Sequence, residues 1–92
     1  METTKDIQIG HYVRSKAGRD KDRLFLVMKI VDEKYVLIAD GDLRRIEKPK
    51  KKKIRHLTLT GYVSESLKEK LSGDGKINNA FLRREIEKLG LN

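Results

Sequence analysis

Two neighbouring segments that are apolar at almost every position most constrain how this chain can fold. Residues 24–31 contain one charged side chain, Lys29, and residues 35–39 contain none. The charged residues 32–34 lie between them and predict a turn. A strand wetted on one face alternates apolar and polar residues, so two such strands must be covered on both faces. The sequence therefore predicts a sheet with a core on each side.

Shorter segments on either side predict a small antiparallel sheet. Tyr12 and Val13 begin one strand, and the polar run 15–22 forms the loop after it. Asp40-Gly41-Asp42 is a tight-turn signal in which Gly41 can adopt a positive φ. Segments 43–47 and 54–59 are predicted to pair across the lysine run between them. This gives about five strands in about fifty residues, the size of a small barrel.

The C-terminal third predicts two helices that cover the outer face of this sheet. Their apolar stripes have helical spacing and consist of Val63, Leu67 and Leu71 in the first helix and Ile77, Phe81, Leu82, Ile86 and Leu89 in the second. Residues 72–75 break the pattern. Ser66 with Glu69 has capping-box spacing, Asn78 is a predicted N-cap, and Gly90 is a suitable stop. We expect one domain, with a barrel over 1–60 and a packed helical extension over 61–92.

Positive charge is concentrated in one part of the chain. The net charge is +8, from 22 Lys and Arg against 14 Asp and Glu, and residues 43–56 hold eight of the cations and one anion. A charge run of this kind is either a solvated loop or a binding site for a polyanion, which gains free energy by counterion release. We favour RNA binding, with arginines on strands and lysines on a mobile loop between them. The predicted contacts are Arg44, Arg45, Lys48, Lys50, Lys51, Lys52, Lys53 and Arg55.

The loop between the first two strands is a second predicted contact. Its candidate residues, arranged around a glycine, are Arg14, Lys16, Gly18, Arg19 and Lys21. The alternative is a polar hairpin tip in which Asp20 and Asp22 neutralise two of these cations. Aromatic residues are few and are not interleaved with the basic cluster in the sequence, so a base-stacking platform is not predicted.

No arrangement of residues predicts an enzyme. The chain has no cysteine, which excludes disulfides, thiolate metal sites and thiol nucleophiles, and His11 and His56 lack the neighbours of a metal site. We expect no catalytic residue, metal or cofactor. The apolar runs are too short to span a membrane, and the first residues do not resemble a signal peptide. The expectation is a cytoplasmic protein, with a monomer favoured.

Several spaced elements resemble the KOW motif of RNA-binding proteins. They are Gly10, Val13, Ser15, Gly18, Arg19 and Asp20, then the apolar run 24–31, residues 35–38, the turn at Asp40-Gly41, the pair Arg44-Arg45 and residues 54–57. Together, over residues 10–60, they look like the KOW-containing large-subunit ribosomal proteins of archaea and eukaryotes, the fourteen-e, six-e and twenty-seven-e group. The resemblance implies an SH3-like barrel that binds ribosomal RNA through the loop around Gly18 and the later arginines. One departure is Asp22, where these proteins commonly carry a second glycine.

The resulting hypothesis is a non-enzymatic RNA-binding protein, associated with the ribosome or translation. Its expected fold is mainly β, a five-stranded SH3-like (KOW) barrel covered by one or two C-terminal α-helices. The alternative is a protein-interaction KOW module of a transcription or translation complex, and nonspecific DNA binding is a third possibility. Exposure of the helical apolar stripes would favour the protein-interaction alternative.

Overall fold

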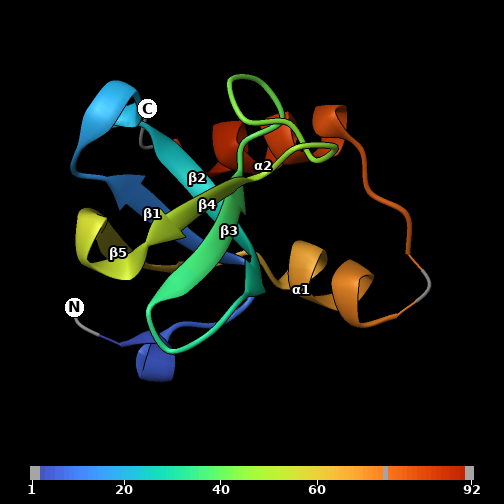
Figure 1. Ribbon diagram of the computed structural model, residues 1–92. Helices are drawn as coiled ribbons and strands as arrows, with labels where there is room; N and C mark the ends of the chain where they lie inside the picture. The colour runs from blue at the N-terminus through green and yellow to red at the C-terminus, as the bar shows by residue number, and fades with distance from the viewer. Residues whose placement is uncertain (1–2, 74, 91–92) are drawn as a thin grey trace.

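The chain forms a five-stranded antiparallel sheet with two helices packed against it (Figure 1). The computed structural model describes residues 3–73 and 75–90, so Asp74 of the predicted break lies outside the described residues. The strands are β1 (His11–Ser15), β2 (Leu24–Ile30), β3 (Tyr35–Ala39), β4 (Lys50–Lys53) and β5 (Leu57–Val63), in the order β4-β3-β2-β1-β5. The helices are α1 (Glu65–Ser72) and α2 (Asn79–Leu89), and the 3-10 turns are η1 (Thr4–Asp6), η2 (Gly18–Asp20) and η3 (Ile54–His56).

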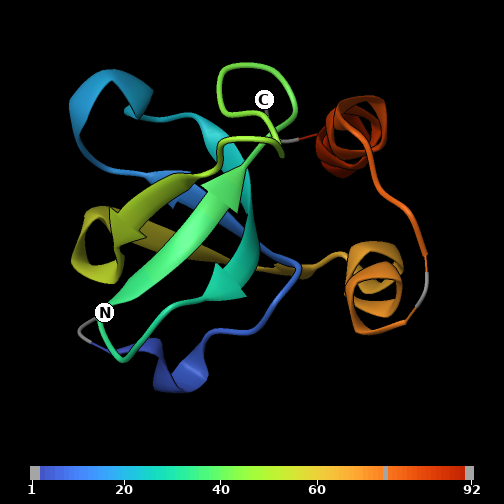
Figure 2. The same ribbon diagram turned by 45° about the vertical axis from the view of Figure 1, so that its right-hand side comes forward.

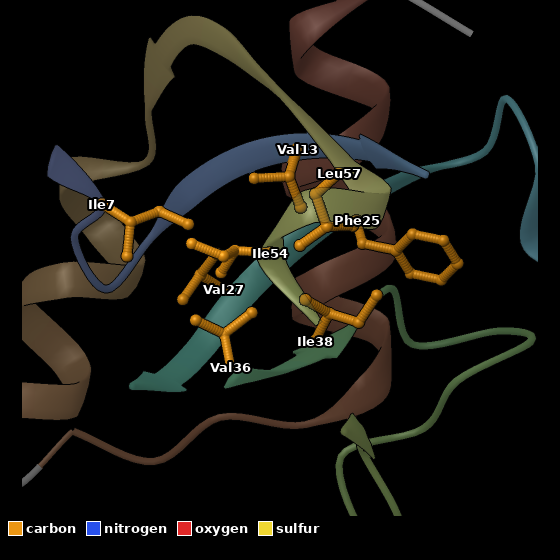
Figure 3. Packing of buried hydrophobic residues seen from close by; sticks show 8 residues of the cluster. All are labelled: Ile7, Val13, Phe25, Val27, Val36, Ile38, Ile54 and Leu57. Atoms are coloured by element: carbon orange, nitrogen blue, oxygen red, sulfur yellow. The ribbon is translucent and has the colours of Figure 1, made fainter. Parts of the chain in front are cut away.

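The apolar strands β2 and β3 have a core on each side, as the sequence predicts. Alternate side chains, such as Phe25, Val27 and Val36, enter an inner cluster on the concave side of the sheet. Figure 3 shows its eight buried members, which are Ile7, Val13, Phe25, Val27, Val36, Ile38, Ile54 and Leu57. Burying one such side chain stabilises the fold by about 1.5–3 kcal/mol. This cluster joins β1, β2 and β3 to η3 and to the beginning of β5.

The other side chains of the same strands meet the two helices. This outer cluster consists of Tyr12, Leu24, Leu26, Ala39, Leu67, Leu82 and Ile86, with Met28, Ile46, Ile77, Phe81 and Leu89 packed against it. Figure 2 shows α1 and α2 together on one side of the sheet. Most of the two predicted stripes is buried inside the molecule, although Leu71 is exposed. Two predicted members are not helical: Val63 is the last residue of β5, and Ile77 precedes the N-cap of α2.

The sheet is open at β4 and β5, which are its two edges. The prediction of five antiparallel strands with two helices is confirmed, whereas closure into a barrel is not confirmed by the strand pairing. The edge strand β4 consists of four lysines. Lysine on an edge strand opposes pairing with another chain, so these charges also protect the edge from aggregation.

The structure reverses the predicted positions of strand and loop in the basic segment. Residues 43–47, predicted as a strand, lie in the loop between β3 and β4, and Lys50–Lys53, predicted as a mobile loop, forms β4. Arg44 and Arg45 are therefore on a loop and Arg55 is on η3, which precedes β5. The lysine run becomes a strand because β3 pairs with it along its whole length, from Tyr35 opposite Lys53 to Ile38 opposite Lys50.

The ends of the helices follow local signals, with one difference. Asn78 is the N-cap of α2, accepting a hydrogen bond from the Phe81 amide at 2.8 Å, and Gly90 ends the helix with a φ of 68°, both as predicted. The first helix has a different cap from the predicted one. Its N-cap is Ser64, whose hydroxyl accepts from the Leu67 amide at 3.1 Å, so the predicted capping box at Ser66 is wrong.

The turn at Gly41 brings the end of β3 against the first residue of α2. Gly41 has a φ of 80°, as the sequence predicts, and a β-carbon there would lie 2.2 Å from the carbonyl oxygen of Asn79. Only glycine permits this approach. The same contact puts the loop that follows Gly41 within reach of the second helix.

A buried carboxylate, Glu85 of α2, ties the two helices to the sheet. Its Oε1 accepts from the Ser64 hydroxyl at 2.6 Å and its Oε2 from Lys88 at 2.9 Å, while its backbone carbonyl accepts from the Tyr12 hydroxyl at 2.9 Å. Burial raises the pKa of Glu85, but the hydrogen bonds from Ser64 and Lys88 outweigh it, so this pKa lies below its ordinary value of 4.5. The ionised form is therefore favoured by folding.

We expect Glu85→Gln to lower the free energy of unfolding by about 1 kcal/mol at pH 7 and by less in acid. A lowered folded-state pKa means that the unfolded chain binds the proton first. The stabilisation is thus complete above about pH 4.5 and is lost as the pH falls through the folded-state value. Urea denaturation of both proteins from neutral to acid pH measures the difference. Glu87→Gln, at an exposed position of the same helix, is the control, and a difference for Glu85→Gln that stays constant into acid would contradict the prediction.

Candidate nucleic-acid interface

Asp20 is a buried carboxylate that joins the two basic segments predicted from the sequence. Its side chain is 2% exposed and accepts two hydrogen bonds from one terminal nitrogen of Arg44, at 3.1 and 3.2 Å. The ammonium of Lys52 lies 3.9 Å from Asp20 Oδ2 and donates to the carbonyl of Ala17 at 3.1 Å. A carboxylate with this little solvent is stable only when it is paired and hydrogen-bonded. Asp20 therefore holds three separate segments together.

The three segments are two loops and one strand at the same end of the molecule. We call residues 16–23, between β1 and β2, the Gly18 loop, and residues 40–49, between β3 and β4, the arginine loop. Both views show these loops at the end of the molecule opposite η1 (Figures 1 and 2). Strand β4 continues directly from the arginine loop, and its Lys52 reaches under the Gly18 loop.

The predicted contact residues divide into an exposed set and a set that is used inside the fold. Arg44 and Lys52 direct their charged groups to Asp20, and Lys52 is buried. Arg14 is half-buried and donates to the carbonyl of Asp22 at 2.6 Å. The remaining predicted cations are exposed, or half-buried in the case of Lys53, and we call them the basic face: Lys16, Arg19, Lys21, Arg45, Lys48, Lys50, Lys51, Lys53 and Arg55.

The Gly18 loop is an ordered turn, and Asp22 adopts a conformation that favours glycine. Gly18 has a φ of 76° and Asp22 a φ of 68°, so both lie in the left-handed region. Aspartate tolerates this region better than most residues. The Asp22 amide donates to the carbonyl of Ser15 at 2.8 Å, which closes the loop. Asp22, which replaces the glycine of the KOW pattern, therefore has a backbone conformation that suits glycine.

Ion pairs fix the beginning of the arginine loop. Arg23 donates to Asp40 at 2.7 Å and to Asp42 at 2.6 Å, and the hydrogen bond to Asp40 is the main reason that its pKa is raised. The other oxygen of Asp40 accepts from the backbone amides of Asp42 at 3.0 Å and Arg44 at 2.9 Å. Asp40 is buried, so these bonds hold the turn in one conformation.

Asn79, the first residue of α2, holds the other half of the same loop. Its Oδ1 accepts from the Ile46 amide at 2.9 Å, and its Nδ2 donates to both oxygens of Glu47 at 2.8 and 2.9 Å. The hydrogen bond from Asn79 is the main reason that the pKa of Glu47 is lowered. Arg83, one turn further along, donates to the carbonyl of Gly41 at 2.7 Å. The second helix therefore positions the arginine loop at both ends.

Asn79 was not a predicted site residue, although the sequence carries a signal for it. It stands three residues before Leu82 and seven before Ile86, on the buried stripe of α2. A polar residue at an apolar-stripe position must find a hydrogen-bond partner when it is buried. Which partner it finds depends on the tertiary structure.

An aromatic ring does lie among the basic residues in space, contrary to what their separation in the sequence indicates. The ring of Tyr35 on β3 is 4.8 Å from Lys51 Nζ and 5.9 Å from Lys53 Nζ. The β3–β4 register places these side chains on one face of the sheet. Distances of this size allow cation–π attraction, which holds both lysines over the ring.

Within 3–73 and 75–90, no three His, Asp or Glu side chains are grouped so that they could hold a metal ion. His11 is buried, with Nε2 3.0 Å from the carbonyl of Thr60, and His56 is exposed. Over the same ranges, no helix combines the length and the apolar character that crossing a bilayer requires.

We expect Asp20→Asn to lower the free energy of unfolding by about 3 kcal/mol, because it leaves Arg44 and Lys52 without their shared counterion. Urea denaturation at pH 7 measures the loss. Asp42→Asn is the matched control, since Asp42 also pairs with an arginine but is 69% exposed, and we expect it to cost less than about 1 kcal/mol. Equal losses for the two variants would show that burial of Asp20 has no special role.

Asn79→Ala is expected to free the arginine loop while leaving α2 folded. Because the Ile46 amide loses its acceptor, its hydrogen exchange should accelerate by up to about tenfold. The Phe81 amide, which Asn78 caps, should be unaffected. The reciprocal variant Asn78→Ala should cost about 1 kcal/mol and accelerate exchange at Phe81 but not at Ile46. Unchanged exchange at Ile46 in Asn79→Ala would contradict the assigned role.

Most of this chain is similar to a bacterial protein of known name. No protein-family model matches the chain. A protein of Bacillus subtilis (strain 168) that bears the name "Putative ribosome-binding protein YbzG" is 37% identical to it over 73 residues, which cover 79% of this chain and 99% of the relative. Similarity of this extent, over nearly the whole of the relative, shows common ancestry. The chain therefore belongs to the same family as the Bacillus subtilis protein YbzG.

Proposed function

We propose that this protein binds ribosomal RNA through the basic face and associates with the ribosome in the cytoplasm. It acts in this proposal as a binding protein without catalytic activity, metal or cofactor. The observation that carries the proposal is the convergence of the Gly18 loop, the arginine loop and β4 at one end of the molecule, held by Asp20. Nine cations from these segments and η3 remain on the surface.

The physical basis of binding would be electrostatic. A folded RNA carries closely spaced phosphates with condensed counterions, and a rigid group of cations releases these ions on binding. The ion pair of Asp20 with Arg44 and the hydrogen bond of Asn79 with Ile46 support this, because they hold the loops in place before any ligand binds. Pre-ordered loops lose less conformational entropy on binding than mobile ones.

The name of the relative supports the ribosome as the location of this RNA. The YbzG protein is called ribosome-binding, and it matches this chain over 99% of its own length. We extend this property to the present chain as part of the proposal.

We also propose that the fold is an SH3-like barrel of the KOW type with an incompletely paired sheet. Ile54, the first residue of η3, and Leu57, the first residue of β5, join Val13 and Val36 in the inner cluster. The sheet thus curves so that its two edge strands are connected through one short turn. The left-handed residues Gly18 and Asp22 of the β1–β2 loop are consistent with the same resemblance.

The protein-interaction alternative has less support. This alternative requires the apolar stripes of the helices to be exposed, but Leu67, Leu82 and Ile86 are buried against the sheet. Tyr62 and Leu71 remain exposed, and they are single residues on different elements. Scattered exposed apolar residues of this kind are normal on a protein surface.

Replacing Lys50, Lys51 and Lys53 by serine should weaken binding to ribosomal RNA and make it less dependent on salt. If about six phosphates are neutralised, the slope of log affinity against log salt is on the order of −5, and the triple variant should reduce its size by about 2 to 3. Lys52 is kept because it is part of the fold. Fluorescence anisotropy with a ribosomal RNA fragment, over about 50 to 400 mM KCl, gives both quantities.

A charge-matched variant controls for net charge. Lys5, Lys68 and Lys76, which are exposed on η1, on α1 and in the segment between the helices, are replaced by serine. This variant should retain the slope of the unmodified protein. Binding without salt dependence, or equal effects of the two triple variants, would refute the proposed face. Equal affinity for duplex DNA in competition would indicate nonspecific nucleic-acid binding instead.

A further inference from the structure

A hollow in the basic face lies between the arginine loop and the beginning of β4. Its volume is about 420 Å³. Seven residues line it, and five of them are cations: Leu43, Arg44, Arg45, Lys48, Pro49, Lys50 and Lys51. The lining includes no acidic side chain, so an anionic group is the ligand that these walls favour. Small-ligand sites in proteins begin at about 300 Å³, so the hollow is large enough for one nucleotide.

The apolar residues in the lining indicate that the ligand has an apolar part as well as a phosphate. Leu43 is 49% exposed, although most of its neighbours in the segment are charged. Together with Pro49 it gives the hollow an apolar wall. A bare phosphate gains nothing from such a wall, whereas the flat face of an unstacked base can be buried against it.

The hollow is formed in advance, because the loop around it is fixed at three places. Asp40 holds the amide of Arg44, Asp20 holds its guanidinium, and Asn79 holds the amide of Ile46. Ile46 also packs against the outer cluster. A site that does not need to form on binding retains more of its interaction energy.

We propose that this hollow receives a single unpaired nucleotide of the bound RNA. The inference rests on the proposed function and deepens it. Lysines of the lining, such as Lys48 and Lys50, contact the flanking phosphates, and the base packs on Leu43 and Pro49. A fully paired helix keeps its bases stacked inside, so it can engage the basic face but cannot fill the hollow.

The experiment compares two short RNA hairpins that differ in one unpaired residue. One is fully paired, and the other carries a single bulged 2-aminopurine whose fluorescence reports its surroundings. We expect the protein to bind the bulged hairpin roughly tenfold more tightly and to change the 2-aminopurine fluorescence. Leu43→Ser should remove this preference and leave affinity for the paired hairpin unchanged.

A matched control and the salt slope separate failure of the inference from failure of the proposed function. Val31→Ser alters an apolar residue that is 40% exposed elsewhere, directly after β2, and this variant should keep the preference. Equal binding of both hairpins with a steep salt slope would overturn the nucleotide site and leave RNA binding intact. Binding of neither hairpin, nor of the ribosomal RNA fragment, would refute the proposed function itself. If a polyglutamate peptide binds more tightly than the bulged hairpin and needs Leu43, the hollow is a peptide site and the inference is wrong.

Discussion

Burial of β2 and β3 on both faces is the constraint on which the rest of this structure depends. Their apolar side chains require an inner cluster, made with β1 and the segment around η3, and an outer cluster, made with the two helices. Covering the outer face brings α2 beside the turn at Gly41. From there Asn79 and Arg83 reach the arginine loop. The hydrophobic core thus determines where the charged loop lies.

A second constraint comes from the concentration of positive charge. Like charges close together repel, and a fold that gathers them needs counterions within it. Asp20 is the counterion of Arg44 and Lys52, and Asp40 and Asp42 are the counterions of Arg23. Arg44 and Lys52 thereby become structural, Arg14 donates to the carbonyl of Asp22, and the other nine predicted contact cations remain on the surface. The chain therefore uses buried carboxylates to order a surface that is complementary to a polyanion.

The sequence predicted correctly those elements that depend on a short local pattern. It predicted wrongly the strand whose position depends on pairing with a distant segment. The central strands, the turn at Gly41, the N-cap at Asn78 and the stop at Gly90 follow from neighbouring residues. Residues 43–47 were predicted as a strand because they are bounded by a turn and a lysine run. The lysines form that strand instead, because β3 offers them an unpaired edge and Tyr35 accommodates two of their side chains.

The sequence alone was sufficient to predict a sheet with a core on each side, a pair of helices that cover it, and a basic segment. Each of these features depends on the periodicity or the composition of neighbouring residues. Which cations are exposed, and how the two loops meet, followed only from the folded molecule. Asp20 and Asn79 have partners 24 and more than 30 residues away. A side chain meets such partners only after the core has brought distant segments together, so no neighbouring residue can indicate them.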